Sequence, residues 1–472
     1  MIRRLITATL AAALAAAPVA AGAQAYPPQP KPAAPKPFKV PASQTFRLAN
    51  GMEVTLIPYG SVPKAVVSLR IAAGSLNEAE NTWLASLTSQ MLREGAAART
   101  GAQIAEAAAG MGSSLSVGSD RHETSLALNV LSEHSADAIR LIADVARRPT
   151  FPTADFERVR QNMLRSLAVA RSQPQSAADV ALLAAYYGTS HPYGRAVPTE
   201  AQLRAYTLED VRRFYQENFG AKRARLYIAG RFDAARVSAA VRQAFGDWAP
   251  GRDRLKLAPQ PKQGPQVLLV DRPGAPQSTV RLAFPAPVAG SRSDIPFRVT
   301  NALLGGSFTS RITRNLREDK GYTYSPSSGT TLNAGEALWT FNGDITTEVT
   351  GAALKEIFSE VRRLQNEAPP AEEATGMRTW MAGTFVLANA SPSGLINSIA
   401  TRDFHGLPAN WLDNYVPGVL AVESAAMRDA ARERFPLEKM TLVIVGDLAK
   451  VEPQLRTLPE LQGMEMKRVN PF

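Results

Sequence analysis

Cysteine is absent from this chain of 472 residues. The absence excludes a thiol nucleophile, a cysteine-ligated metal and a disulfide framework. No Gly-x-Ser-x-Gly motif occurs either, which excludes the nucleophile turn of the α/β-hydrolases. The fold must therefore be stabilised by hydrophobic cores large enough to need no cross-link, and a chain of this length predicts about two to four domains.

Long apolar runs are also missing beyond residue 25, so the sequence predicts no membrane-spanning helix. The first 25 residues combine Arg3 and Arg4, an alanine-rich apolar run and the small-residue ending Ala-Gln-Ala. This pattern is typical of a secretory signal peptide, and we expect cleavage after Ala25 and export to the periplasm.

Acidic residues are outnumbered by basic ones, and the formal net charge is +11, or +9 without Arg3 and Arg4. This excess is small for a chain of this size, and an exported protein rarely meets nucleic acid. We therefore expect no nucleic-acid partner.

Histidine is scarce. The chain has four histidines: His122, His134, His191 and His405. No two of them are three or four residues apart, so the sequence contains no pair of histidines that could bind a metal from one face of a helix. Asp120, His122 and Thr124 alternate along a predicted strand, but two candidate ligands do not make a metal site, and we interpret them as a solvated strand edge. His191 precedes a proline and is expected to be a loop residue that bonds locally.

Two proline-rich stretches divide the chain. Residues 26–41 contain seven prolines and predict an extended spacer, and residues 250–265 predict a linker. They delimit a first αβ domain at 42–249 and a second at 266–472. Within the first, Asn50-Gly51 in TFRLANGMEVTLIPY predicts a β-hairpin.

The two halves resemble each other. A helical pattern at 207–219 leads to the strand RLYIAGRF, and one at 424–435 leads to TLVIVGDL. Equivalent positions in these segments are 216 residues apart, as in the pairs Phe219/Phe435, Leu226/Leu442 and Gly230/Gly446. Such a constant offset indicates a duplication. The sequence predicts an α+β fold of two homologous domains, each an antiparallel sheet covered by helices.

The stretch LASLTSQMLREG, residues 84–95, predicts a helix with Ser86, Ser89 and Gln90 on one face. It resembles the zinc-binding helix of the pitrilysin and mitochondrial processing peptidase family, whose inverted motif is His-x-x-Glu-His. In that resemblance Ser86 replaces the first histidine, Ser89 the glutamate base and Gln90 the second histidine.

The segment FERVRQNMLRSL, residues 156–167, resembles the family helix that supplies the third zinc ligand, and Ser166 stands at the ligand position. Hydroxyl and amide groups are too weak to replace histidine and carboxylate ligands of catalytic zinc. The resemblance therefore implies degenerate zinc-motif positions and no metal or other cofactor in this chain.

A second resemblance lies in NALLGGSFTSRITRNLREDKGYTYSPSSG, residues 301–329. The pattern predicts a helix broken by two glycines, a second helix over 307–319 and a strand from residue 321. In the family, an arginine and a tyrosine seven residues later handle the substrate, and Arg317 and Tyr324 fit that spacing. Tyr322, expected on the same strand face, is a weaker rival. Arg311 and Arg314 are expected to be solvated.

The resemblance implies the zinc-less subunit of a heterodimeric metallopeptidase, forming half of a clam-shaped dimer around peptide substrates. A homologous partner subunit would carry zinc and the His-x-x-Glu-His motif, while Arg317 and Tyr324 would act in trans. The alternative is a peptidase-derived binding or scaffold protein with no catalytic role. A stand-alone enzyme would require chemistry that no motif of the sequence indicates.

Overall fold

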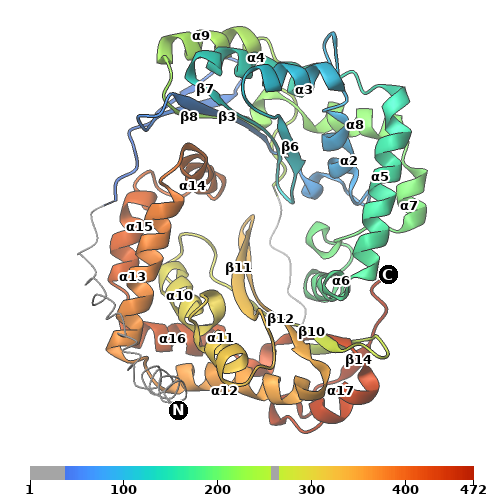
Figure 1. Cartoon of the computed structure of the whole chain (residues 1–472), viewed down its shortest axis with the longest axis vertical. Helices are drawn as coiled ribbons and strands as arrows, with labels where there is room; N and C mark the ends of the chain where they lie inside the picture. The colour runs from blue at the N-terminus through green and yellow to red at the C-terminus, as the bar shows by residue number, and fades with distance from the viewer. Residues whose placement is uncertain (1–37, 257–264) are drawn as a thin grey trace, which may run out of the picture. The chain divides into compact units, whose positions relative to one another are not determined.

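The computed structural model describes residues 38–256 and 265–472 (Figure 1). The predicted signal peptide, most of the predicted proline-rich spacer and residues 257–264 of the predicted linker lie outside the described residues. In the part described, no helix is both long and apolar enough to cross a membrane.

The first sheet has the strand order β1-β2-β8-β3-β7-β6. Its strands are β1 (Gln44–Arg47), β2 (Glu53–Pro58), β3 (Lys64–Ile71), β6 (Ser116–Ser119), β7 (Thr124–Leu131) and β8 (Ala224–Gly230). The hairpin predicted at Asn50-Gly51 is confirmed, because β1 and β2 pair antiparallel and Gly51 has a φ of 93°. Glycine adopts this conformation without steric cost.

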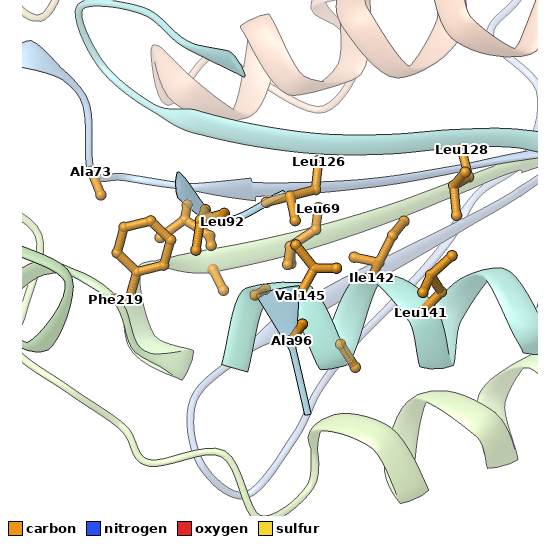
Figure 2. Packing of buried hydrophobic residues seen from close by; sticks show 14 of the residues in the cluster. Leu69, Ala73, Leu92, Ala96, Leu126, Leu128, Leu141, Ile142, Val145 and Phe219 are labelled. Atoms are coloured by element: carbon orange, nitrogen blue, oxygen red, sulfur yellow. The ribbon is translucent and has the colours of Figure 1, made fainter. Parts of the chain in front are cut away.

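Helices and short elements between these strands complete the first half. They are η1 (Ser75–Asn77), α2 (Leu84–Met91), β4 (Gly95–Ala96), β5 (Arg99–Thr100), α3 (Gly101–Gly110), η2 (Ser132–His134), α4 (Ser135–Arg147), α5 (Thr153–Ser172), α6 (Pro174–Tyr187), η3 (Pro192–Gly194), α7 (Glu200–Ala205), α8 (Leu208–Asn218), η4 (Ala221–Arg223) and α9 (Ala234–Phe245). Apolar side chains of α4, such as Ile142 and Val145, meet Leu69 and Leu126 on one face of the sheet (Figure 2).

The second sheet has the order β11-β12-β10-β13-β9-β14. Its strands are β9 (Gln266–Asp271), β10 (Gln277–Pro285), β11 (Ser327–Asn333), β12 (Glu336–Thr346), β13 (Thr441–Gly446) and β14 (Met466–Arg468). The helical segments of this half are α10 (Asp294–Asn301), η5 (Ala302–Gly306), α11 (Arg311–Thr313), η6 (Arg314–Asp319), η7 (Thr347–Val349), α12 (Thr350–Asn366), α13 (Ala371–Ala388), α14 (Pro392–Phe404), α15 (Trp411–Leu420), α16 (Ser424–Arg434), η8 (Leu437–Lys439), α17 (Leu448–Leu455) and η9 (Pro459–Leu461).

Strand pairing confirms the two-domain α+β fold expected from the duplication. Leu69 of β3 pairs with Leu226 of β8, and Leu282 of β10 pairs with Leu442 of β13. Leu226 and Leu442, which the sequence offset matches, therefore occupy equivalent places in the two sheets. Each sheet is mixed rather than wholly antiparallel, because β8 runs parallel to β2 and β13 runs parallel to β9. Both parallel strands follow a long helical connection, which parallel pairing requires.

Each half covers the other half's sheet with one helix. Apolar residues of α6 pack with strands β9, β10 and β13 of the second sheet, and those of α14 pack with β2, β3 and β8 of the first. Two hydrogen bonds reinforce these contacts: Tyr187 to Glu336 at 2.6 Å and Tyr227 to Asp403 at 3.1 Å.

The predicted solvated strand edge at Asp120 and His122 is wrong. Both residues lie in a turn before β7, where the Asp120 carboxylate accepts the backbone N–H groups of His122 and Glu123. The imidazole is packed against the ring of Phe404 from α14, and its burial lowers the pKa of His122 to about 4. By contrast, local bonding of His191 is confirmed, since its Nδ1 accepts the N–H of Tyr193.

Candidate functional site

The helix at the degenerate zinc motif begins on a buried carboxylate. Glu78 accepts the backbone N–H groups of Trp83 and Ala85 at 3.1 and 2.7 Å, at the start of α2. These donors favour the ionised form, but burial outweighs them and raises the pKa of Glu78 to about 8. Glu78 therefore holds the N-terminus of α2 in place, and the charge of the carboxyl group that does so depends on pH.

The four degenerate positions lie on α2 and α5, which pack against each other. Ser89 is 3% exposed, and its hydroxyl donates to the carbonyl of Ser86 at 2.8 Å. Ser166 on α5 is exposed and donates to the carbonyl of Asn162 at 3.1 Å. Both hydroxyls are thus engaged by the backbone of their own helix. Ser86 and Gln90 are half-buried.

Residues 38–256 and 265–472 contain no group of three or more His, Asp or Glu side chains arranged to hold a metal ion. The donors at the degenerate positions are three hydroxyls and one amide. Catalytic zinc in proteins is held by nitrogen, sulfur or carboxylate ligands, so these four side chains do not fit the metal.

The Arg317 segment is built from distorted helix. The π-helical turn η5 ends after Gly306, α11 covers Arg311–Thr313, and the π-helix η6 covers Arg314–Asp319. Single π-helical turns occur often at functional sites. The predicted break at the two glycines is present, because the backbone becomes extended at Ser307.

Tyr324 lies on an anchored loop and not on the strand expected from residue 321, since β11 begins at Ser327. Gly321 turns the chain with a φ of 65°. The next residues are then held by hydrogen bonds: Tyr322 N–H donates to the Leu316 carbonyl, and Thr323 Oγ1 donates to the Asp344 carbonyl at 2.7 Å. Residues 321–326 therefore form no strand, because the turn at Gly321 and these two hydrogen bonds fix the chain in a loop.

Arg317 lies between two aromatic rings. Its guanidinium carbon is 4.6 Å from the ring centre of Phe308 and 4.9 Å from that of Tyr324, distances at which a cation is attracted to ring faces. Both rings are largely exposed, Tyr324 at 76% and Phe308 at 68%. Within residues 38–256 and 265–472, Arg317 forms one ion pair, in which its Nε lies 3.2 Å from the Glu318 carboxylate. The structure thus brings Arg317 and Tyr324 together at the surface.

Two expectations about neighbouring residues are wrong. Tyr322 does not share a face with Tyr324, because it is half-buried and packs against the core of the second half. Arg311 is not solvated: it is 9% exposed, and its Nε and Nη2 donate to the Glu373 carboxylate at 2.8 and 2.6 Å. Arg314 is exposed, as expected.

Sequence reasoning missed Phe308 and Glu373. Glu373 lies 62 residues after Arg311, on α13, and no local pattern links the two residues. Phe308 follows the glycine break after one residue, Ser307, and a bulky aromatic residue among Ser and Thr residues was the available signal.

The chain has two duplicated α+β domains, and α2 and α5 carry no metal ligands at the zinc-motif positions. With Arg317 beside Tyr324, these features indicate an inactive-type relative of zinc peptidases. Family models give the family. The model described as Insulinase (Peptidase family M16) matches residues 54–198, and the model described as Peptidase M16 inactive domain matches residues 205–379. The chain belongs to the peptidase M16 family.

Curated relatives agree with this family. An "uncharacterized zinc protease" of Mycobacterium bovis is 28% identical over 335 residues, which cover 70% of this chain and 74% of that protein. A "non-peptidase homolog YmxG" of Helicobacter pylori is 21% identical over 84% of this chain and 90% of that protein. The family thus includes proteins named as proteases and one named as a non-peptidase.

Solved structures share the fold. The peptidase M16 inactive domain from Pseudomonas fluorescens has a TM-score of 0.78 at 24% identity, covering 86% of this chain and 98% of that one. A chain of complex III from Candida albicans has a TM-score of 0.73 at 15% identity, covering 87% and 98%.

Proposed function

We propose that this chain is the zinc-less subunit of an exported heterodimeric metallopeptidase. In this proposal a homologous partner carries zinc and the His-x-x-Glu-His motif, and the two chains enclose the peptide substrate. The observation that carries the proposal is the contrast between two sites. The zinc-motif positions hold Ser86, Ser89, Gln90 and Ser166, whereas Arg317 on η6 contacts the exposed ring of Tyr324 on the anchored loop.

Each member of the pair suits one task in peptide hydrolysis. The Tyr324 hydroxyl makes no hydrogen bond among the described residues, so it is available to donate to the oxyanion that forms at a scissile carbonyl. The Arg317 guanidinium is stacked on two rings and pairs with Glu318 through Nε, so its two terminal nitrogens remain available to donate to a neighbouring peptide carbonyl. Neither task requires this chain to bind metal.

A tagged chain recovered from its native host tests the proposal. The purified chain alone should hydrolyse no peptide, whereas the recovered complex should contain a homologous subunit and show hydrolysis that a zinc chelator abolishes. No hydrolysis in either sample, without a metal-binding companion, would contradict the proposal.

The second candidate is a binding or scaffold protein derived from a peptidase. Its support is the likeness in fold to a chain of complex III from Candida albicans and the relative named a non-peptidase homologue. This candidate predicts a stable partner complex in which substitutions at Arg317 and Tyr324 have no effect.

A further inference from the structure

A cavity of about 320 Å³ lies where the first sheet meets α14 and the start of the predicted linker. Part of its wall is apolar and includes Leu76, Ala400 and Phe404. Among the described residues, the charged side chains of the lining are five cations and one carboxylate: Arg70, Arg223, Arg225, Arg254, Lys256 and Glu123. The cavity is therefore strongly positive.

Two of these cations are neutralised within the chain. Arg70 donates to Glu123 at 2.8 Å, and Arg225 lies 2.7 Å from Glu53, a carboxylate just outside the lining. Each of these carboxylates is thereby committed to an arginine. No further carboxylate from residues 38–256 or 265–472 lines the cavity.

Arg223 and Arg254 have no carboxylate partner among the described residues. Arg223 is 5% exposed, and its three hydrogen bonds go to neutral oxygens: the carbonyls of Ala72 and Arg252 and the side-chain amide of Asn218. Arg254 makes no hydrogen bond or ion pair within the part of the chain that the structure describes. Arg223 is buried and Arg254 is half-buried. A charge held away from water without a partner is costly, so these two guanidinium groups favour a ligand that supplies the missing charge.

The pKa of each guanidinium is lowered, although nearby carboxylates act to raise it: Glu53 and Glu123 for Arg254, and Asp253 for Arg223. Burial, with the charge of Arg225, lowers the pKa of Arg254, and burial with the charge of Arg252 lowers that of Arg223. Both guanidinium groups would be stabilised by an anion placed between them. His122 also lines the cavity, and it stays neutral at pH 7 because burial lowers its pKa to about 4.

We propose that this cavity binds a small organic or inorganic anion that presents two or more negative charges on carboxylate or phosphate oxygens. Guanidinium groups bind these oxyanions through paired, charge-assisted hydrogen bonds. Arg223, Arg254 and Lys256 provide the uncompensated charge, and the apolar wall accommodates a short carbon skeleton. The volume lies near the lower end of small-molecule pockets, about 300 to 1,000 Å³.

Binding should also tie the two halves together. The lining combines residues of β3 and β8 from the first half with Ala334, Ala400 and Phe404 from the second. A ligand that binds only this folded arrangement raises the thermal midpoint in proportion to the logarithm of its concentration.

Calorimetric titration and thermal unfolding of the full chain, at constant ionic strength set with sodium chloride, test the site. The probes are citrate for carboxylate and pyrophosphate for phosphate, and the better binder identifies the preferred group. We expect one saturable site and a rise in the thermal midpoint. Arg254→Gln should weaken binding by about 10-fold or more, the size of one charge-assisted contact.

Two features make the result decisive. Arg254→Gln removes no internal hydrogen bond and relieves repulsion from Arg225, so without ligand its thermal midpoint should equal or exceed that of the unmodified chain. Arg292→Gln, which removes an equal charge from an exposed turn, should leave binding unchanged. Absence of saturable binding by both probes, or equal weakening in the two variants, would overturn the proposal.

Discussion

The guanidinium carbon of Arg317 lies 4.9 Å from the ring centre of Tyr324, with the ring of Phe308 on the guanidinium at 4.6 Å. The contact holds two solvent-facing side chains in one arrangement before any substrate is present. Such ordering lowers the entropy lost when a peptide binds.

Removing one ring of the stack should loosen Arg317. Phe308→Ala is expected to reduce hydrolysis by the partnered complex about 2- to 5-fold, the value of an exposed cation–π contact. Phe308→Tyr keeps an aromatic face and should retain activity. Equal rates for the Ala and Tyr variants, measured with the same peptide, would show that the stack has no role.

The Arg311–Glu373 ion pair should anchor α11 to α13. Glu373→Gln leaves a buried guanidinium without its carboxylate and should lower the free energy of unfolding by about 2–3 kcal/mol, somewhat below the cost for a fully buried pair because Glu373 is partly exposed. The neighbouring exposed residue provides the control, since Glu372→Gln should change the urea midpoint little. Similar midpoints for both variants would refute this role.

Glu78 should make stability depend on pH. Its folded pKa of about 8 exceeds the usual carboxyl value of 4.5, so the folded state holds a proton that the unfolded state has lost. Stability from this group is therefore fully present below about pH 4.5 and decreases as pH rises to about 8. Glu78→Gln cannot ionise and should flatten this decrease.

The clearest window for this test is about pH 7.5 to 8.5, above the usual histidine pKa of about 6.5, where His122 is neutral in both the folded and the unfolded chain. Urea midpoints should fall across the window for the unmodified chain and stay nearly level for Glu78→Gln. Parallel curves for the two proteins would contradict the raised pKa.

The packing of α2 on α5 should allow a zinc site to be rebuilt. The triple variant Ser86→His, Gln90→His and Ser166→Glu provides two histidines one helical turn apart and a carboxylate from the facing helix. We expect it to retain about one zinc per chain after dialysis, measured by metal analysis. A matched variant with Ser166→Ala in place of Ser166→Glu should bind zinc more weakly. Equal metal content in the two would show that Ser166 does not face the α2 pair.

Local patterns in the sequence predicted much of the fold. The hairpin at Asn50-Gly51 follows from turn chemistry, and the structure has it. The equivalent places of Leu226 and Leu442 in the two sheets follow from the constant offset of 216 residues. The parallel pairing of β2 with β8 could not be read in this way, because it depends on where a helical connection returns the chain.

The site was less accessible to sequence reasoning. The spacing of Arg317 and Tyr324 anticipated their contact, but the expected strand face did not exist, because the chain turns at Gly321 and Thr323 anchors the loop to β12. Arg311 and Glu373 pair across 62 residues, and the charge of Arg254 is meaningful only beside Arg225, which a different part of the chain supplies. Such contacts arise from tertiary packing, which local periodicity does not encode.

Peptide hydrolysis by the recovered complex carrying Tyr324→Phe tests the central claim most directly. The account predicts unchanged assembly with the partner and a loss of about 10²-fold in turnover, the usual result of removing one oxyanion donor. Tyr322→Phe, a change of the same kind two residues away, should retain full turnover. Full activity of Tyr324→Phe would contradict the claim that this chain completes an active site in its partner.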